Sequence, residues 1–289
     1  MNKSLTILIT LCILLSLGIF LHTIDVHVVL HLVSLIGFKF SLLLLITFLA
    51  YLLGTISWQY ALGHHSKSVS TTRLFLIRHV GETVGIFNPT SIIGGDALKA
   101  FILSRYDIPV KKIASSLLLS RTIMMGTQIM LFATTALALL SQHASLGGIY
   151  HSRQSGFFIT LLGSFKGMRR KLSDLLTDIP EMIRENKKML IYSCLFALLH
   201  WVVGGLEFYL ILKFLGLEVS VLQALIVDLG VVIFKAAGAF IPGQLGVEEY
   251  GNKIMLMAIG HPLEETWVAA SILRRGRQLF WIALGIAFY

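Results

Sequence analysis

Residues 81–100 read GETVGIFNPTSIIGGDALKA, and residues 238–249 read GAFIPGQLGVEE. Both stretches are apolar but are broken by glycine, proline and charged residues. They share the pattern G-x-F-x-P at a spacing of 153 residues, at Gly85, Phe87 and Pro89 in the first stretch and at Gly238, Phe240 and Pro242 in the second. Broken hydrophobic segments that recur in two halves of a chain are typical of transporter-like membrane folds.

The same spacing extends beyond these two stretches. Four of the five prolines pair at 153 residues. The further matched positions are Asp96 with Glu249, Pro109 with Pro262, Arg121 with Arg274, and Leu62-Gly63 with Leu215-Gly216. Because proline is scarce in this chain, we interpret the match as an internal duplication.

The composition of the 289 residues indicates an integral membrane protein. Hydrophobic residues make up 56% of the chain, charged residues 13%, and the mean hydropathy is +0.81. Soluble domains are about 45–50% apolar and about 25% charged. We attribute the net charge of +9 to basic cytoplasmic loops that face anionic lipid, and we expect no nucleic-acid partner.

Residue types that mark metal, cofactor or catalytic sites do not occur at recognisable spacings. Cys12 and Cys194 both lie in apolar runs, and the ten histidines show no metal-binding motif. No lysine-serine pair follows Gly94-Gly95, so a nucleotide P-loop is not supported. We therefore predict no catalytic residues, no metal and no cofactor.

The pattern predicts an all-α, polytopic membrane protein of two inverted repeats, each with a re-entrant hairpin. Residues 71–105 are apolar yet carry breakers and charges that a lipid-facing helix does not tolerate, so we expect them to be re-entrant. The expected parts are a first transmembrane helix and external loop (1–39), repeat one with re-entrant segment 71–105 (40–140), a connecting segment with a basic amphipathic helix (141–189), and repeat two with re-entrant segment 238–260 (190–289).

Charge predicts that the two repeats face opposite sides of the membrane. Lys111-Lys112 of the first repeat matches Glu264-Glu265 of the second. Cytoplasmic loops carry an excess of lysine and arginine, so the two copies are inverted. Inversion requires segment 145–165 to cross the membrane, although it is only weakly apolar. The expected location is the cytoplasmic membrane, with the amino terminus in the cytoplasm.

Glycines and prolines mark the expected turns of the two hairpins. The turn residues that we predict are Gly85, Pro89, Gly94, Gly95, Gly238, Pro242, Gly243 and Gly246. In the first hairpin we place the turn at Gly94-Gly95, with Asp96 as the N-cap of the next half-helix. A helix N-terminus at membrane depth is suited to binding an anion such as a lipid phosphate.

The charged residues in and near the hairpins admit two roles. In one, Asp96 and Glu249 cap their helices and pair with Arg121 and Arg274, because buried charges must be paired. In the other, the charged residues bind a lipid headgroup. The candidates for that site are Asn88, Asp96, Lys99, Arg105, Arg121, Glu248, Glu249 and Arg274. His200 and Glu207 lie seven residues apart, on one face of a helix. Two roles are open for them, a proton relay and hydrogen bonding between helices.

At these residues the chain resembles the transmembrane, flippase-like domain of lysylphosphatidylglycerol synthases and its stand-alone relatives. The resemblance rests on Asn88, Pro89, Gly94-Gly95-Asp96, Lys99-Ala100 and Ser120-Arg121, and on the run from Pro242 to Glu249. It implies movement of a lipid between leaflets. It also implies that lysyl transfer is absent, because the family's soluble aminoacyl transferase domain has no counterpart after the last predicted span.

The leading hypothesis is therefore a transporter rather than an enzyme. The expected substrate is an anionic phospholipid or a polyisoprenyl- or glycosyl-linked lipid. The alternatives are a membrane subunit or enzyme that transfers a glycosyl or aminoacyl group to a lipid, and a lipid-binding scaffold that moves nothing. A separate lipid-modifying enzyme is a further potential partner, and the sequence leaves the oligomeric state open.

Overall fold

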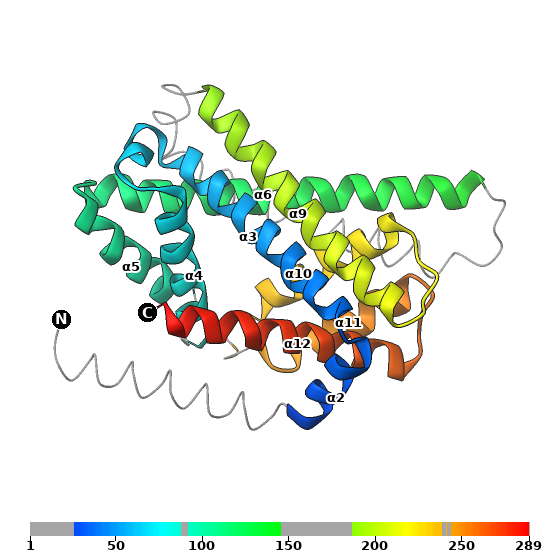
Figure 1. Ribbon diagram of the computed structural model, residues 1–289. Helices are drawn as coiled ribbons and strands as arrows, with labels where there is room; N and C mark the ends of the chain where they lie inside the picture. Colours follow the sequence, from blue (N-terminus) through cyan, green and yellow to red (C-terminus); the bar gives the residue numbers. More distant parts are fainter. Residues whose placement is uncertain (1–25, 88–91, 146–186, 239–240, 242–243, 289) are drawn as a thin grey trace.

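The computed structural model describes residues 26–87, 92–145, 187–238, 241 and 244–288. Over these residues the chain forms α-helices and two short 3-10 helices, with no strand. In chain order they are α2 (Val26–Ile36), α3 (Lys39–Ala61), η1 (Gly63–Ser68), α4 (Thr71–Phe87), α5 (Ile92–Leu103), η2 (Ser104–Tyr106), α6 (Val110–Ser145), α9 (Lys187–Phe214), α10 (Val221–Ala237), α11 (Val247–Ala258) and α12 (Glu264–Ala287) (Figure 1). The all-α prediction is confirmed.

Several sequence-based predictions concern residues outside this described part. They are the first transmembrane helix, the crossing of 145–165, and most of the basic amphipathic helix in 141–189. The external loop predicted before residue 39 is corrected, because Val26–Ile36 forms the helix α2.

Three helices of the described part are long and apolar enough to cross a membrane. They are Lys39–Ala61, Val110–Ser141 and Lys187–Phe214. In contrast, α4 and α10 have 17 residues each, and α5 and α11 have 12 each. At 1.5 Å per residue none of these four reaches across a hydrocarbon core of about 30 Å. Their lengths fit half-helices that enter and return.

Backbone conformation repeats at the spacing found in the sequence. Helix α3 ends at Ala61 and α9 ends at Phe214, 153 residues later. Gly63 and Gly216, at the same spacing, both adopt positive φ values, of 63° and 79°, as a helix C-terminus favours. Asp107 (φ 56°) and Gly260 (φ 93°) form a second such pair. The duplication is therefore a structural one, with α3 to α6 corresponding to α9 to α12.

The two equivalent long helices, α3 and α9, pack against each other in antiparallel directions. Ser57 and Ser193 each donate a hydrogen bond to the other's carbonyl, at 2.9 and 2.8 Å. The Ala50 carbonyl accepts a hydrogen bond from His200. Ala50 lies seven residues before Ser57 and His200 lies seven residues after Ser193, as antiparallel helices require. Figure 1 shows the two helices side by side through the middle of the molecule. Small side chains and shared hydrogen bonds are the usual basis of such close packing in membranes.

The first hairpin is formed by α4 and α5, and its turn differs from the prediction. Gly94 and Gly95 lie inside α5, so they are not the turn and Asp96 is not an N-cap. Instead, Gly95 faces the backbone of Gly81 and Gly85 in α4, where a Cβ atom would collide. The glycines therefore allow two helices to approach closely. Pro89 and Asn88 lie in the connection, outside the described residues.

The second hairpin, α10 and α11, has its turn where the sequence predicts it. Gly238 is the C-cap of α10 and packs against Val247, the first residue of α11. Gly246 has a φ of 78° and precedes α11 as its N-cap. Pro242 and Gly243 belong to the same connection but lie outside the described residues.

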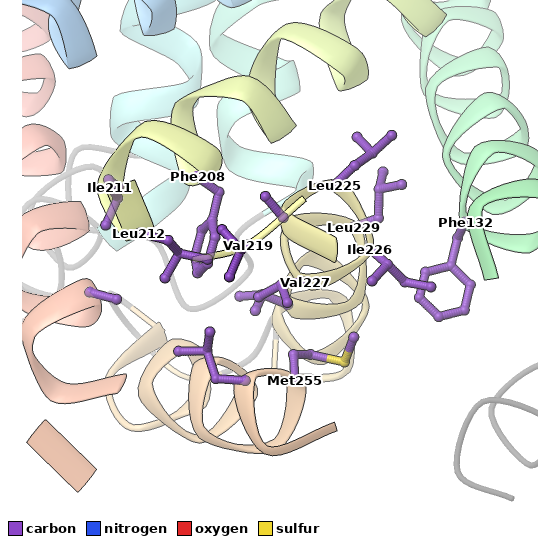
Figure 2. Close-up of a cluster of buried hydrophobic side chains, with 14 of the residues drawn as sticks. Phe132, Phe208, Ile211, Leu212, Val219, Leu225, Ile226, Val227, Leu229 and Met255 are labelled. Atoms are coloured by element: carbon purple, nitrogen blue, oxygen red, sulfur yellow. The ribbon is translucent and has the colours of Figure 1, made fainter. Parts of the chain in front are cut away.

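The main hydrophobic core surrounds α10. Every residue from Ala224 to Val231 is buried, so this helix is covered on all sides by protein. Figure 2 shows its side chains packed against Phe132 of α6, Phe208 of α9 and Met255 of α11. This packing fixes the second hairpin and the residues that it carries. A second core, around Trp58 and Leu103, supports the first hairpin.

We predict that positions 111 and 264 lie on opposite sides of the membrane. The antiparallel packing of equivalent helices supports this prediction, which the fold alone does not test. Single cysteines at Lys111 and Glu264, both exposed, in a Cys12→Ser, Cys194→Ser background should label from opposite sides in intact cells. Labelling of both positions from one side would exclude inverted repeats.

The α4–α5 contact should not tolerate a side chain at Gly95. We expect Gly95→Ala to lower the free energy of unfolding by about 1–3 kcal/mol, because the added methyl group meets backbone rather than a movable side chain. Gly126→Ala is the matched control, since a Cβ atom at Gly126 in α6 meets nothing within 4 Å. The measurement is thermal unfolding in detergent, and equal melting temperatures for the two variants would contradict the prediction.

Candidate functional site

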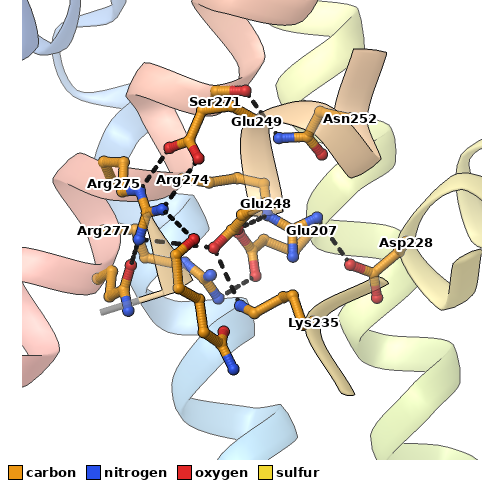
Figure 3. Close-up of polar contacts among 12 residues, drawn as sticks. Glu207, Asp228, Lys235, Glu248, Glu249, Asn252, Ser271, Arg274, Arg275 and Arg277 are labelled. Atoms are coloured by element: carbon orange, nitrogen blue, oxygen red, sulfur yellow. Dashed lines mark hydrogen bonds and ion pairs between the residues drawn. The ribbon is translucent and has the colours of Figure 1, made fainter. Parts of the chain in front are cut away.

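Three arginines of α12 form the centre of a buried ionic network. They are Arg274, Arg275 and Arg277, which lie within four residues of an otherwise mostly apolar helix. Four carboxylates from α9, α10 and α11 face them, together with Lys235 (Figure 3). Ionised groups at membrane depth are costly unless paired, so this network constrains how four helices assemble.

Arg274 links α12 to both helices of the second hairpin. Its Nη1 atom lies 2.9 Å from Asp228 of α10, and its Nε atom lies 2.8 Å from Glu248 of α11. Its guanidinium also lies 5.0 Å from the ring centroid of Phe208 in α9. Arg274, Asp228 and Glu248 are all buried. Removing any one of the three would leave an uncompensated buried charge.

The neighbouring Arg275 binds Glu249, which corrects the pairing predicted from the repeat. Its Nε and Nη2 atoms donate to the two carboxylate oxygens of Glu249 at 2.8 and 3.1 Å. It also donates to the carbonyl of Gln244, in the connection before α11. The expected pair of Glu249 with Arg274 is wrong, because consecutive residues of α12 point to different sides and each takes its own carboxylate.

Arg277 and Lys235 complete the network. Arg277 donates to Glu207 of α9 at 2.7 Å, and Thr47 of α3 donates to the same carboxylate oxygen at 3.1 Å. Lys235 of α10 donates to Glu248 at 3.0 Å. The cations Lys235, Arg274, Arg275 and Arg277 are thus matched by the anions Glu207, Asp228, Glu248 and Glu249. The α12 network is electrically neutral.

A second charged cluster lies on the first hairpin. Lys99 of α5 donates to Glu82 of α4 at 2.5 Å and to Asp96 at 3.2 Å. Arg121 of α6 donates to the other oxygen of Asp96, so the pairing of Asp96 with Arg121 agrees with the sequence-based expectation. We call Glu82, Asp96, Lys99, Arg121 and the nearby Arg78 the α4–α6 cluster.

Arg78 of α4 contributes a cation to this cluster without a carboxylate within ion-pair distance in the described part of the chain. Its Nη1 atom donates to the carbonyl of Tyr51 in α3 at 2.8 Å. Its guanidinium occupies the space beside Gly54 that a Cβ atom at that position would fill. The α4–α6 cluster therefore combines three cations with two carboxylates.

Two histidines, the half-buried His200 and the buried His79, join helices by hydrogen bonds to main-chain carbonyls. His200 Nδ1 donates to Ala50 at 2.6 Å, and His79 Nε2 donates to Trp281 of α12 at 2.8 Å. Glu207 binds Arg277 and Thr47. Of the two roles considered for His200 and Glu207, these contacts favour interhelical hydrogen bonding.

The α12 network and the α4–α6 cluster differ in exposure as well as in charge. The side chains of Arg274, Asp228 and Glu248 are at most 9% exposed. In the α4–α6 cluster, Asp96 is 19% exposed, Arg121 36% and Glu82 55%. The centre of the first arrangement is closed, although Glu249 is 30% and Lys235 22% exposed at its edge. The second arrangement is open at Glu82 and Arg121.

The structure thus divides the residues predicted for a headgroup site. Asp96, Lys99 and Arg121 come together in the α4–α6 cluster, and Glu248, Glu249 and Arg274 belong to the α12 network. Arg105 is exposed in η2, where it lies over the ring of Phe101, and it joins neither group. Asn88 lies outside the described residues.

The sequence analysis did not select several residues that the structure places in these groups. They are Arg78, Glu82, Asp228, Lys235, Arg275 and Arg277, and Glu207 was selected only together with His200. One signal was available, since Glu82 and Lys235 are 153 residues apart and each ties the first helix of its hairpin to the second. Their charges are opposite, so a search for identical residues passes over them. Among the described residues no group of three histidine, cysteine or acidic side chains could hold a metal ion.

Comparison with known families matches residues 5–285 to the family described as "Lysylphosphatidylglycerol synthase TM region". The chain belongs to this family. The match covers nearly the whole chain and confirms the resemblance seen in residues 81–100 and 238–249. Comparisons with curated proteins and with solved structures found no match.

We predict that Arg274 is required for folding. Arg274→Ala leaves the buried carboxylate of Asp228 unpaired and removes one cation from the buried Glu248, so the free energy of unfolding should fall by about 3–5 kcal/mol. The matched control is Lys213→Ala, which breaks the exposed pair with Glu218 and should have little effect. Membrane abundance and thermal unfolding in detergent give the measurement. A stable, abundant Arg274→Ala protein would contradict the structural role.

Proposed function

We propose that the protein translocates a lipid with an anionic headgroup between the leaflets of the cytoplasmic membrane, and that the α4–α6 cluster binds the headgroup. The observation that carries the proposal is the contrast between the two ionic groups. The α12 network is neutral and its centre, formed by Arg274, Asp228 and Glu248, is closed. Among the described residues the α4–α6 cluster has an excess of one cation, and it is open at Glu82 and Arg121. Family membership provides independent support for a membrane domain of the flippase-like type.

The chemistry of the α4–α6 cluster suits a phosphate. Arg121 and Lys99 already hold the carboxylate of Asp96, which is a smaller anion of similar hydrogen-bonding geometry. A phosphate can replace that carboxylate, because guanidinium groups bind carboxylate and phosphate in the same two-pronged manner. Arg78 supplies the additional positive charge. The acyl chains would remain in the bilayer during this exchange.

The hairpins offer a route for the headgroup. In this proposal helices α4 and α5, which have 17 and 12 residues, enter the membrane and return without crossing it. Irregular backbone at membrane depth occurs where protein or a water-filled cavity covers it. In inverted-repeat transporters, substrate sites lie at the repeat interface and access alternates by rocking of one repeat against the other. In this proposal α12, fixed by its arginines, belongs to the rigid part, and α4 and α5 belong to the part that moves.

Charge at the two ends of the helices supports an orientation. The end formed by η1, η2 and the first turns of α4, α6 and α9 carries Lys67, Arg73, Arg105, Lys111, Lys112, Lys187 and Lys188. The acidic residue at this end, among those described, is Asp107. The opposite end carries Glu218, Glu264 and Glu265 with Lys39 and Lys213. We call the end that carries the lysines and arginines of η1, η2, α4, α6 and α9 the basic end. By the positive-inside rule the basic end faces the cytoplasm.

The test is lipid exchange by purified protein in vesicles that contain a fluorescent phosphatidylglycerol. A membrane-impermeant quencher reports the fraction of label in the outer leaflet over time. The wild-type protein should exchange the label without any added donor. Product formation that needs a glycosyl or aminoacyl donor would instead indicate a lipid-modifying enzyme, and neither outcome would indicate a scaffold.

Arg121→Ala should abolish at least nine-tenths of this exchange while the protein remains folded, because it removes the partly exposed guanidinium but no fully buried one. Arg105→Ala is the matched control, since Arg105 is exposed on η2 outside the cluster, and it should exchange lipid at the wild-type rate. Thermal unfolding of both variants checks the fold. Wild-type exchange by a folded Arg121→Ala protein would refute the assignment of the headgroup site.

A further inference from the structure

A pocket of about 100 Å³ opens at the basic end of the protein, between α3, α6 and α9. Its lining residues are Tyr60, Ala61, Leu62, Gly63, His64, His65, Lys112, Leu119, Ile123, Met189, Leu190 and Ser193. None of the residues assigned to the α4–α6 cluster or the α12 network lines it. It is therefore a separate feature of the fold.

The floor of the pocket is apolar and its rim is cationic. Leu119 and Ile123 are buried at the floor, and the Ser193 hydroxyl there donates to the carbonyl of Ser57 at 2.8 Å. At the rim, Lys112 and His64 are exposed. Ammonium and imidazole groups donate hydrogen bonds to anionic oxygens. An occupant that matches both parts has an anionic head and an apolar body.

Aromatic side chains place the pocket at the level of the lipid headgroups. Tyr60, a lining residue, stacks on Tyr192 and Phe196 of α9, with ring centroids 5.3 and 5.6 Å apart. Tyrosine is enriched where a membrane-spanning helix meets the aqueous phase. Further along the same helix, Leu195 and Leu199 expose apolar side chains, which an acyl chain can cover.

The pocket and the α4–α6 cluster lie on opposite sides of α6. Lys112 lines the pocket, and Arg121 belongs to the cluster. They are nine residues apart, which is two and a half helical turns, so they point in opposite directions about 13 Å apart along the axis. A molecule in the pocket therefore does not occupy the headgroup site proposed above.

We propose that this pocket binds the phosphate of an anionic phospholipid from the leaflet at the basic end, with the acyl chains along the exposed face of α9. The phosphate lies at the rim beside Lys112 and the two histidines. The apolar floor and the aromatic wall receive the first carbons of the lipid. This site lies at the membrane surface, and lipid binding to it does not require translocation.

The test compares lysines that neighbour each other in sequence. Lys111 and Lys112 are both exposed in the first turn of α6, but only Lys112 lines the pocket. Native mass spectrometry of the full-length protein, titrated with phosphatidylglycerol or phosphatidylcholine in detergent, measures lipid binding. We expect a preference for phosphatidylglycerol, about fivefold weaker binding in Lys112→Gln, and less than twofold change in Lys111→Gln.

A second pair of variants tests the shape of the pocket. Met189→Trp fills the pocket and should prevent retention of phosphatidylglycerol. Leu118→Trp is its control, because Leu118 is exposed on α6, does not line the pocket and lies away from the exposed face of α9. Thermal unfolding checks both proteins. Should Met189→Trp fail to fold, the two exposed lysine variants still decide the question.

Three outcomes would overturn the proposal. Equal losses in Lys111→Gln and Lys112→Gln would show a general attraction of anionic lipid to the basic end. Equal binding of phosphatidylcholine would show that the site does not select an anion. Displacement of the lipid by millimolar inorganic phosphate, with no effect of Met189→Trp, would show a site for a soluble phosphate. Binding is measured without transport, so these outcomes are distinct from a failure of the translocation proposal.

Discussion

The requirement that charge at membrane depth be paired constrains this structure more than any other interaction. Helix α12 carries three arginines, and each takes a carboxylate from a different place, so that α9, α10 and α11 are all bound to it. The hydrophobic effect does not select one arrangement of apolar helices in lipid, because lipid tails are as apolar as leucine. The α12 network supplies a directional constraint, and α10 is buried on all sides as a result of the packing around it.

The two halves use the same architecture with different chemistry. Both contain a long helix, a hairpin of two half-helices and a further long helix, and in both an ion pair joins the two helices of the hairpin. In the second half the charges are balanced and the central ones are buried. In the first half a cation is in excess among the described residues and the group is partly exposed, so duplication has left one copy suited to scaffolding and the other suited to binding an anion. We propose this difference in role between the two halves. If the two ionic groups were instead equivalent sites, Arg274→Ala and Arg121→Ala would have the same effect.

Glycine has different roles in the two hairpins. In the first hairpin Gly81 and Gly95 allow backbones to approach, and in the second Gly238 and Gly246 lie at the turn. A sequence pattern of glycines near a proline is compatible with both roles. The difference between the hairpins is where the second helix begins relative to the glycines: α5 begins at Ile92, before Gly94 and Gly95, whereas α11 begins at Val247, after Gly246. The turn predicted at Gly94-Gly95 was wrong for this reason.

By itself the sequence determined the class of protein, the duplication and the family, because composition and the spacing of prolines and glycines are properties of the chain alone. It also identified Asp96 with Arg121, a pair whose partners lie in adjacent elements. Only the tertiary structure decided that Glu249 binds Arg275, that Arg274 binds Asp228 and Glu248, and that Arg105 stands apart. Which carboxylate meets which arginine depends on the rotation of each helix about its axis. That rotation is fixed by packing between helices far apart in sequence, and no local pattern encodes it.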